Sequence, residues 1–523
     1  MRKFLMLSAI MLLIVLVVYP LYSLIIRAFV SYGRLSLDNF YEIFQNKQNY
    51  VALYHSLFVS LISTAIATTL GAVLAWIVGR TNIPYRGTLR TALVMPFIIP
   101  PFITAMAWLQ LLGPAGYINT IYMDLTGSWD PLFVIYGKWA IILVMTLSGY
   151  PFVFLTTLGG LERMNPELEE AAQNSGSGTF KVMRDITLPL MAPTIAAGSL
   201  LVFVSRIANF GIAAVMGMPE NYYVLTTKIY RLIDQSFVVE NAQEVATAMS
   251  VLLVVIAGAG LIGAKVYLRG KQYTVISGKD VQPKIVELVR SRHLLFGFCL
   301  FIVLVSTVLP VLAMVFTALT KAYGLPPVIS NWTLDNFHYV LIELQMTKRA
   351  IRNSFFLAVS ASTVTVFSGL IIAYIVVKTQ TKGKQLLDIT ASMPYSVPGT
   401  VFALGMILAW NKEFFGSFSI YNTIWILLAA YIARYMAHAV RTTSASLAQI
   451  HDSHEEAGRI SGARWTQSFR DIVLPLVRPG IFAGWFIIFM PALRELTISV
   501  LLWSAGNETL GVAVYNLQEG GDV

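Results

Sequence analysis

The sequence has few charged residues and almost no cysteine. Asp, Glu, Lys and Arg make up 12% of its 523 residues, whereas soluble domains carry about 25%. The one cysteine, Cys299, lies in an apolar run. An internal disulfide and two-cysteine metal or redox motifs are therefore excluded. A chain with so little polar surface is suited to a lipid bilayer rather than to water alone.

Several signatures of catalysis and binding are also missing. The Gly-Lys pairs at 270–271 and 383–384 are each followed by Gln, and no Gly-Lys pair in the sequence is followed by Ser or Thr. The sequence therefore contains no nucleoside triphosphate phosphate loop. No His, Cys or carboxylate cluster has metal-ligand spacing. No basic stripe with interleaved aromatics accompanies the net charge of +10. We expect no catalytic residue, no metal site and no nucleic-acid partner.

Hydrophobic residues are abundant, at 56%, and they gather in long runs. A spanning helix needs about 20 mainly apolar residues, and runs this long and continuous predict helices rather than barrel strands. The first run is too long for a signal-peptide core, so we predict that it is a retained membrane helix. The predicted spans are 4–27, 55–79, 91–112, 138–161, 191–216 and 243–266, then 294–318, 353–377, 388–411, 419–441 and 480–503.

Two polar segments between these runs match each other. Residues 170–189 read EAAQNSGSGTFKVMRDITLP, and residues 456–475 read EAGRISGARWTQSFRDIVLP. Each opens on Glu-Ala, places a Gly six residues after the Glu and ends on Ile-x-Leu-Pro, where we expect a membrane helix to restart. Met-Pro pairs at 95–96 and 393–394 recur in the same order. The sequence therefore predicts two tandem parallel repeats.

We predict a first repeat at 1–268, a cytoplasmic linker at 269–292 and a second repeat at 293–523. Lys and Arg collect between the second and third predicted helices, between the repeats and after the eighth helix. Because such residues stay on the cytoplasmic side of a membrane, the N-terminus and both Glu-Ala segments are predicted to be cytoplasmic.

Each Glu-Ala segment has the features of a short helix that another protein can approach. Asn165 can cap the first helix, and Asp452 or Ser453 the second. The small residues leave a smooth face, and the Gly permits a turn with positive φ. The matched copies predict two contacts with one kind of cytoplasmic partner, made by Glu170, Ala171, Ala172 and Gly176 and by Glu456, Ala457, Gly458 and Gly462.

This spacing resembles the signature of permease subunits of bacterial ABC importers that use a substrate-binding protein. The second copy departs from the pattern only in Gly458, which replaces an Ala. The resemblance implies an all-α, multi-pass protein of the bacterial inner membrane with the type I importer permease fold. Its two coupling helices would each sit on one of two ATPase subunits, which bind ATP and Mg, while this chain binds no cofactor. A substrate-binding protein would dock at the outer face.

Segments 209–230 and 493–515 are similar to ferric-iron importer permeases, so ferric iron is the predicted cargo. Fused thiamine permeases share the layout, and thiamine, polyamine, phosphonate or another small solute stays an alternative. A secondary carrier or channel without an ATPase is the rival from another class. The family pattern also leads us to expect a twelfth helix after residue 523.

Polar residues and helix breakers at membrane depth are candidates for the pathway. Asn209 and Glu495 occupy equivalent positions of the two repeats, beside Arg206 and Arg494 respectively. An ion pair between Arg206 and Glu495 that holds the halves together is the alternative. The helix breakers Met95-Pro96 and Met393-Pro394 predict a hinge or gate, since broken helices commonly line transport sites; simple packing kinks are the alternative.

Overall fold

The computed structural model describes residues 2–31, 33–165, 167–236, 238, 241–268, 285–289, 291–326, 328–411, 419–451 and 453–521. They form two compact units: unit 1 holds 1–46, 229–254 and 338–522, and unit 2 holds 47–228 and 255–337. The compact units do not coincide with the sequence repeats. Each unit contains the first helix of one repeat and most helices of the other repeat. Most of the predicted linker lies outside the described residues, and the predicted repeat boundaries stay a prediction.

Unit 2 is centred on three long helices that pack against one another: α4 (Lys47–Arg80), α8 (Gly137–Arg163) and α11 (Leu188–Ile207). Shorter elements surround them: α5 (Arg86–Ala92), η2 (Met95–Phe97), α6 (Pro101–Leu112), α7 (Tyr117–Thr126), α9 (Glu167–Asn174), α10 (Thr179–Val182), η3 (Met183–Thr187), α12 (Gly211–Gly217), η4 (Met218–Glu220), α15 (Ser291–Val303), η5 (Leu304–Val308), α16 (Leu309–Leu319) and η6 (Ile329–Asn331). Three helices have residues in both units: α13 (Leu225–Asp234), α14 (Ala242–Leu268) and α17 (Asp335–His338).

Unit 1 repeats this arrangement with α18 (Gln345–Lys378), α21 (Ile424–Ala448) and α24 (Leu474–Leu493). Its other elements are α1 (Arg2–Leu13), η1 (Ile14–Val18), α2 (Tyr19–Ala28), the antiparallel strands β1 (Val30–Ser31) and β2 (Arg34–Leu35), α3 (Asp38–Gln45), η7 (Tyr339–Glu343), α19 (Lys384–Ser396), α20 (Gly399–Trp410), α22 (Ser453–Ile460), α23 (Trp465–Ser468), η8 (Phe469–Val473), α25 (Ser499–Leu502) and α26 (Leu510–Gly520).

Matched glycines bring the long helices of each unit close together. A Cβ at Gly71 of α4 would lie 2.7 Å from the carbonyl oxygen of Tyr150 on α8. At Gly369 of α18, it would lie 3.0 Å from the carbonyl carbon of Ala439 on α21. Small residues at membrane helix interfaces allow such close backbone approach. The equivalent crossings show that the sequence repeat is also a structural repeat.

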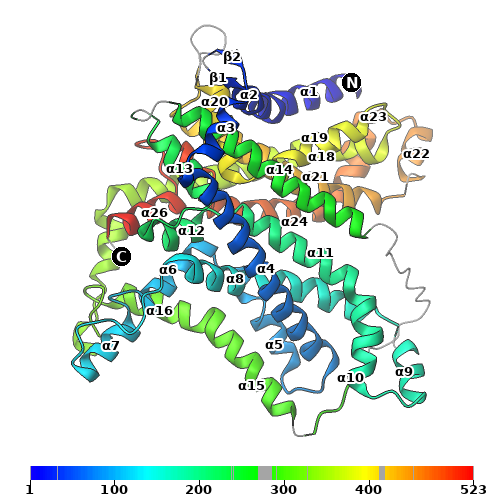
Figure 1. The fold of residues 1–523 in the computed structure, drawn as a ribbon. Helices are drawn as coiled ribbons and strands as arrows, with labels where there is room; N and C mark the ends of the chain where they lie inside the picture. The colour runs from blue at the N-terminus through cyan, green and yellow to red at the C-terminus, as the bar shows by residue number, and fades with distance from the viewer. Residues whose placement is uncertain are drawn as a thin grey trace. The chain divides into compact units, whose positions relative to one another are not determined.

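The first helix of each repeat packs on helices of the other repeat. In unit 1, α2 packs against α20, with the rings of Tyr19 and Trp410 5.9 Å apart (Figure 1). In unit 2, α16 packs against α6, and the hydroxyl of Tyr323, just after α16, donates to the carbonyl of Leu109 at 3.0 Å. Each compact unit therefore contains helices from both repeats.

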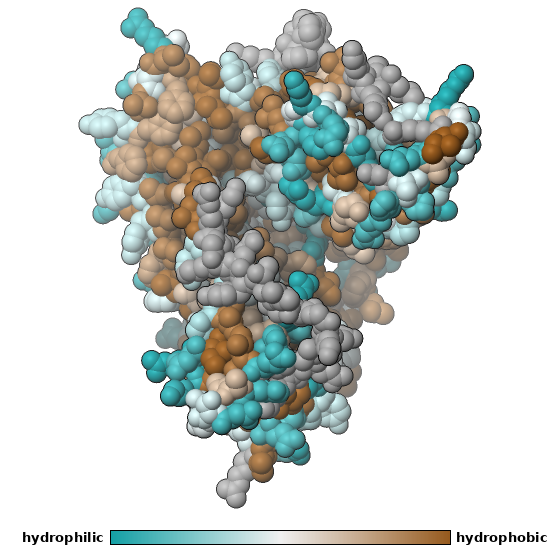
Figure 2. Space-filling view, turned by 90° about the vertical axis from the view of Figure 1, so that its right-hand side faces the viewer, coloured by the Kyte–Doolittle hydropathy of each residue, from teal (hydrophilic) through white to brown (hydrophobic). Residues whose placement is uncertain are grey.

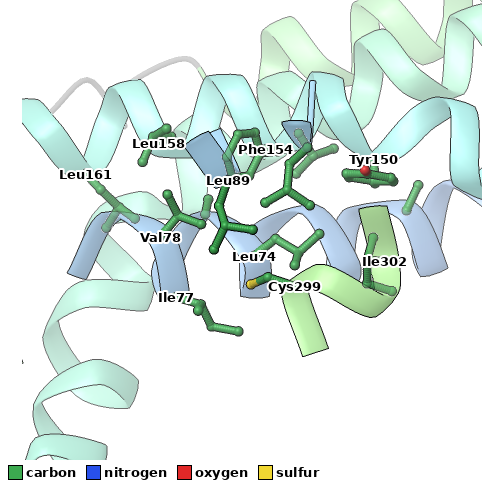
Figure 3. Close-up of a cluster of buried hydrophobic side chains, with 14 of the residues drawn as sticks. Leu74, Ile77, Val78, Leu89, Tyr150, Phe154, Leu158, Leu161, Cys299 and Ile302 are labelled. Carbon is green, nitrogen blue, oxygen red and sulfur yellow. The ribbon is translucent and has the colours of Figure 1, made fainter. Parts of the chain in front are cut away.

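The core of unit 2 shows the same exchange. Tyr150, Phe154 and Leu158 of α8 face Leu74 and other residues of α4, and Cys299 of α15 lies beside them (Figure 3). All five of these side chains are buried. The lone cysteine is therefore a core residue contributed by the first helix of the second repeat.

Among the described residues, four long helices contain a π-turn immediately before a Leu-Pro or Tyr-Pro pair. The residue preceding the proline donates its N–H five residues back in every case, as from Leu188 to Met183 and from Leu474 to Phe469. Proline has no N–H for the ordinary bond, and a π-turn accommodates the insertion without ending the helix. The predicted helix restart at Pro189 and Pro475 was wrong: continuous helices run over Phe180–Ile207 and Trp465–Leu493.

Ten of the eleven predicted spans correspond to helices long and apolar enough to cross a membrane, or to bent pairs of such helices. Eight are single helices, and two, at 86–126 and 384–410, are bent by 95° and 109°. The remaining predicted span, 419–441, falls on α21, which is not among these helices. Many large apolar side chains are exposed, such as Phe301 and Phe482, and Figure 2 shows wide hydrophobic areas on one face of the molecule. Such a surface suits lipid contact.

Replacing either matched glycine by alanine should destabilise the protein. Gly71→Ala and Gly369→Ala each force a methyl group into a packed helix crossing, and overpacking of this kind costs about 1–3 kcal/mol. Gly297→Ala is the control, because a Cβ there meets nothing within 4 Å. Thermal unfolding in detergent should show a lower midpoint for the first two variants. A midpoint equal to that of the control would contradict the close crossing.

Candidate functional site

The two Glu-Ala segments form short helices that begin in the same way. The backbone N–H of Glu167, the first residue of α9, donates to the side-chain oxygen of Asn165 at 3.0 Å, which confirms the predicted cap. In the second copy, the N–H of Ser453, the first residue of α22, donates to His451 Nδ1 at 3.3 Å. His451 thus occupies the place of Asn165, while the cap predicted at Asp452 lies outside the described residues.

Both helices end at a glycine in the left-handed conformation. Gly176 has φ +87° and Gly462 has φ +81°, as the sequence predicted. The residue after each glycine closes the helix by a bond five residues back, from Ser177 N–H to Ala172 O and from Ala463 N–H to Gly458 O, both 3.0 Å. This is the Schellman arrangement, in which glycine avoids the steric penalty of a Cβ. The spacing from Glu to Gly that the two copies share therefore has a structural cause.

The carboxylate of Glu169 fixes α9 to the rest of unit 2. Its Oε1 accepts a hydrogen bond from Thr187 Oγ1 at 2.6 Å, and its Oε2 lies 3.4 Å from Arg80 Nη1. Arg80, the last residue of α4, and Glu169 are both buried. The Arg80 guanidinium also donates to Leu161 O at 3.4 Å. A buried carboxylate needs such a partner, because an unpaired charge is costly away from water.

Glu455 has the equivalent place on α22, with a different partner. Its Oε2 accepts from the hydroxyl of Tyr374 on α18 at 2.9 Å. The indole N–H of Trp465 donates to the same hydroxyl at 2.9 Å. The rings of Tyr374 and Phe469 also meet edge to face, with centroids 5.4 Å apart. The second anchor therefore includes an aromatic cluster.

The residues predicted to meet a partner are exposed next to these anchors. Glu170, Ala171, Glu456 and Ala457 are solvent-exposed, and Ala172 is half-buried. Gly458 differs, because it is buried and a Cβ there would lie 2.8 Å from Ile472. The departure from alanine at this position thus serves packing inside the chain.

The sequence prediction selected the outward-facing glutamates and missed the inward-facing ones. Each copy contains a Glu-Glu pair, at 169–170 and 455–456. Adjacent helix residues point in different directions. When one glutamate of a pair faces solvent, the other can therefore face the helix bundle. The Glu-Glu pair occurs in both copies, and this repetition is the feature of the sequence that could have predicted the two anchoring glutamates.

The predicted breakers Met95-Pro96 and Met393-Pro394 lie shortly before bends of the helices. Met95 and Met393 are 44% and 42% exposed, while Pro96 and Pro394 are buried. The bends follow a few residues later, at Pro100-Pro101 and Pro398-Gly399. The guanidinium of Arg434 bonds the carbonyls of Pro394 and Val397 at the second bend. Both segments are therefore broken helices, and their role as hinge or gate stays a prediction.

The matched polar pair at 209 and 495 caps helical turns. Asn209 Oδ1 accepts from the N–H of Ile212 at 3.0 Å, and Glu495 Oε1 accepts from the N–H of Ile498 at 3.0 Å. Both follow the end of a long helix, α11 or α24. Their equivalence thus has a local structural cause, and a role in the pathway stays a prediction.

Arg206 and Arg494 lie next to these caps. Arg206 is buried, donates to Ser148 Oγ at 3.1 Å and packs on Gly149. Arg494 is half-buried at the end of α24. Arg206 and Glu495 belong to different compact units, so an ion pair between them also stays a prediction.

Comparison with known proteins places these elements in context. Residues 67–268 and 365–523 match the family described as binding-protein-dependent transport system inner membrane component. The Fe(3+)-transport system permease protein FbpB 2 of Haemophilus influenzae is 24% identical over 96% of this chain and 91% of its own length. The ferric transport system permease protein FbpB of Actinobacillus pleuropneumoniae is 24% identical over 99% and 74%. A bacterial ABC transporter involved in alginate import superposes on 50% of this chain and 93% of its own, with 23% identity and a TM-score of 0.44.

Removal of the first anchor should loosen α9 selectively. Glu169→Ala leaves the buried Arg80 guanidinium without a carboxylate, and breaking a buried ion pair costs about 3–5 kcal/mol. Hydrogen–deuterium exchange of peptides that contain α9 should become faster. Glu169→Gln should have a smaller effect, because its amide oxygen can still accept from Thr187. Glu170→Ala, at an exposed position, is the control and should leave exchange unchanged; equal exchange in all variants would show that Glu169 is no anchor.

Proposed function

Because this chain belongs to the family of binding-protein-dependent transport system inner membrane components, we propose that it is the permease of an ABC importer for ferric iron. It is a multi-pass inner-membrane transport subunit and not an enzyme. Membership of the family removes the alternative of a secondary carrier or channel. The cargo, the copy number of the partners and the sites of contact are the proposed part.

The observation that carries the coupling role is the matched pair of polar helices. Each of α9 and α22 exposes a Glu-Ala face while an adjacent buried glutamate fixes the helix to a long apolar helix. Such a helix can receive a force on its exposed face and transmit it through its anchor. Two equivalent faces suit two copies of one ATPase subunit, each contacting one helix.

Force applied to α9 would reach two candidate membrane spans. The Glu169 carboxylate is bonded to Arg80, at the end of α4, and to Thr187, in the π-turn that continues into α11. In the second repeat, Glu455 is bonded to Tyr374 of α18, and Trp465 joins this contact from α23, which continues into α24. Closure of an ATPase dimer would therefore move the long helices of both repeats.

ATP and Mg would be bound by the ATPase, since the sequence contains no phosphate loop. The excess of Lys and Arg near 80–90, 378–384 and the segment between the repeats supports a cytoplasmic N-terminus and a cytoplasmic location of α9 and α22. A substrate-binding protein would dock on the opposite face and deliver the cargo.

The names of relatives that span nearly the whole chain support ferric iron as the cargo. Within the described residues, no group of three His, Cys, Asp or Glu side chains is placed to hold a metal ion. Recognition of iron would then rest with the binding protein, and the permease would let the ion pass.

The decisive test is ATP hydrolysis by the chain assembled with its ATPase. Ferric-loaded binding protein should stimulate hydrolysis, and Glu170→Ala combined with Glu456→Ala should abolish that stimulation, because both exposed faces lose their carboxylate. Steady-state phosphate release in proteoliposomes measures the effect. We expect at least a tenfold loss of stimulation, equivalent to about 1.4 kcal/mol or more of coupling.

The control is a double variant at matched acidic positions outside the two helices, Asp185→Asn with Asp471→Asn. These side chains are exposed and lie 3.8 Å from their neighbouring arginines. Equal loss in both double variants would show a general charge effect and reject the coupling role. Stimulation by another loaded binding protein, and none by the ferric form, would keep the importer and change its cargo to another small solute such as thiamine, polyamine or phosphonate.

A further inference from the structure

The end of the segment between the repeats lies along the turn that follows α4. The N–H of Val286 donates to the carbonyl of Arg80 at 2.7 Å, and the N–H of Asn82 donates to the carbonyl of Val286 at 3.3 Å. The side chain of Asn82 accepts from the N–H of Leu288 at 2.9 Å and donates to its carbonyl at 3.5 Å. Residues 285–289, called the strap below, are thereby fixed to the first repeat.

The strap supports the residue that anchors α9. The carbonyl of Arg80 accepts from the strap, while its guanidinium meets the Glu169 carboxylate at 3.4 Å. Arg80 Nε and Nη1 have no hydrogen-bond partner within the described residues, and Nη1 meets Glu169 as an ion pair only. The strap therefore holds the backbone of the residue whose guanidinium pairs with Glu169.

A cavity of about 230 Å³ lies between these elements and shows how close they are. Its walls come from the end of α4, from α9, from the η3 region and from the strap, and include Trp76, Arg80, Glu169, Gln173 and Glu287. The strap and α9 thus face the same small space. A shift of the strap would change the surroundings of the ion pair that holds α9.

The second coupling segment has different contacts at its anchor. Its carboxylate accepts from the Tyr374 hydroxyl, to which the Trp465 indole also donates, and both residues belong to the same repeat. Lys378, which ends α18 as Arg80 ends α4, donates to the carbonyl of Ile450 at 2.6 Å. In the part of the chain that the structure describes, no β-bridge joins the turn after α18 to another segment. The two anchors therefore differ in what stabilises them.

We propose that the strap is a positioning element for α9, so that the two ATPase contacts are not equivalent. Asn82 is its main side-chain contact. The inference rests on the proposed coupling role of α9 for its consequence in transport, but the positioning itself is a property of this chain. Displacing the strap releases α9 and leaves α22 in place.

Spin labels on matched exposed residues test this difference. In the full chain in nanodiscs, with Cys299→Ala as background, a label is placed through Ala171→Cys or Ala457→Cys. Asn82→Ala removes both side-chain bonds to Leu288. Since one hydrogen bond shifts an equilibrium by about fivefold, the ratio of mobile to immobile label at 171 should rise about fivefold or more. The label at 457 should not change.

Two further variants sharpen the result. Val286→Pro removes the N–H that donates to Arg80 while leaving Asn82 intact, and it should reproduce the effect at 171. Gln380→Ala changes the exposed residue that corresponds to Asn82 in the second repeat, and it should leave both labels unchanged. An unchanged label at 171 in Asn82→Ala overturns the proposal, as does an equal increase at 171 and 457, which would indicate general loosening.

Transport adds a second readout in the assembled importer. Asn82→Ala should lower the amount of ferric iron imported per ATP hydrolysed about twofold, because one of two ATPase contacts is affected. If the strap variants mobilise the 171 label while Glu170→Ala with Glu456→Ala leaves stimulation intact, the coupling role fails and the positioning role stands. If the label does not respond but the glutamate variant abolishes stimulation, only the strap is rejected.

Discussion

A buried carboxylate on a short polar helix is the interaction on which the coupling architecture depends. Glu169 and Glu455 each place a carboxyl group inside the helix bundle. Each must find a partner there, because an unsatisfied buried carboxyl group is costly. That requirement fixes the orientation of α9 and α22, and the next residue, Glu170 or Glu456, then faces outward. One Glu-Glu pair thus supplies both the buried anchor and the exposed carboxylate of each helix.

The two repeats share a backbone arrangement and differ in the side chains that anchor α9 and α22. Matched glycines, π-turns and Schellman turns recur at equivalent positions. The partners of the anchors do not recur, since one is an arginine and the other a tyrosine within an aromatic cluster. Duplication preserves backbone geometry wherever Gly or Pro dictates it, whereas side-chain contacts can be replaced by others of similar energy. The first anchor borders residues 285–287 of the segment that joins the repeats.

Packing of each first helix on the other repeat has a mechanical consequence. The core of unit 2 contains Cys299 from the second repeat, and α20 in unit 1 receives α2 from the first. Neither repeat can bury its apolar helix faces alone, so a change in one repeat reaches elements of the other by direct contact. The continuous helices through the π-turns extend this connection toward the polar ends.

The sequence by itself determined the membrane class, the repeat, the approximate spans and the positive-φ glycines, because hydrophobic length and Gly or Pro chemistry are local properties. It also located the Glu-Ala faces. Only the tertiary structure decided which glutamate of each pair is buried, that Asn209 and Glu495 cap helical turns, and that the first helices are exchanged. These features depend on contacts between residues far apart in the chain, and no periodicity or spacing encodes which distant side chain will satisfy a buried polar group.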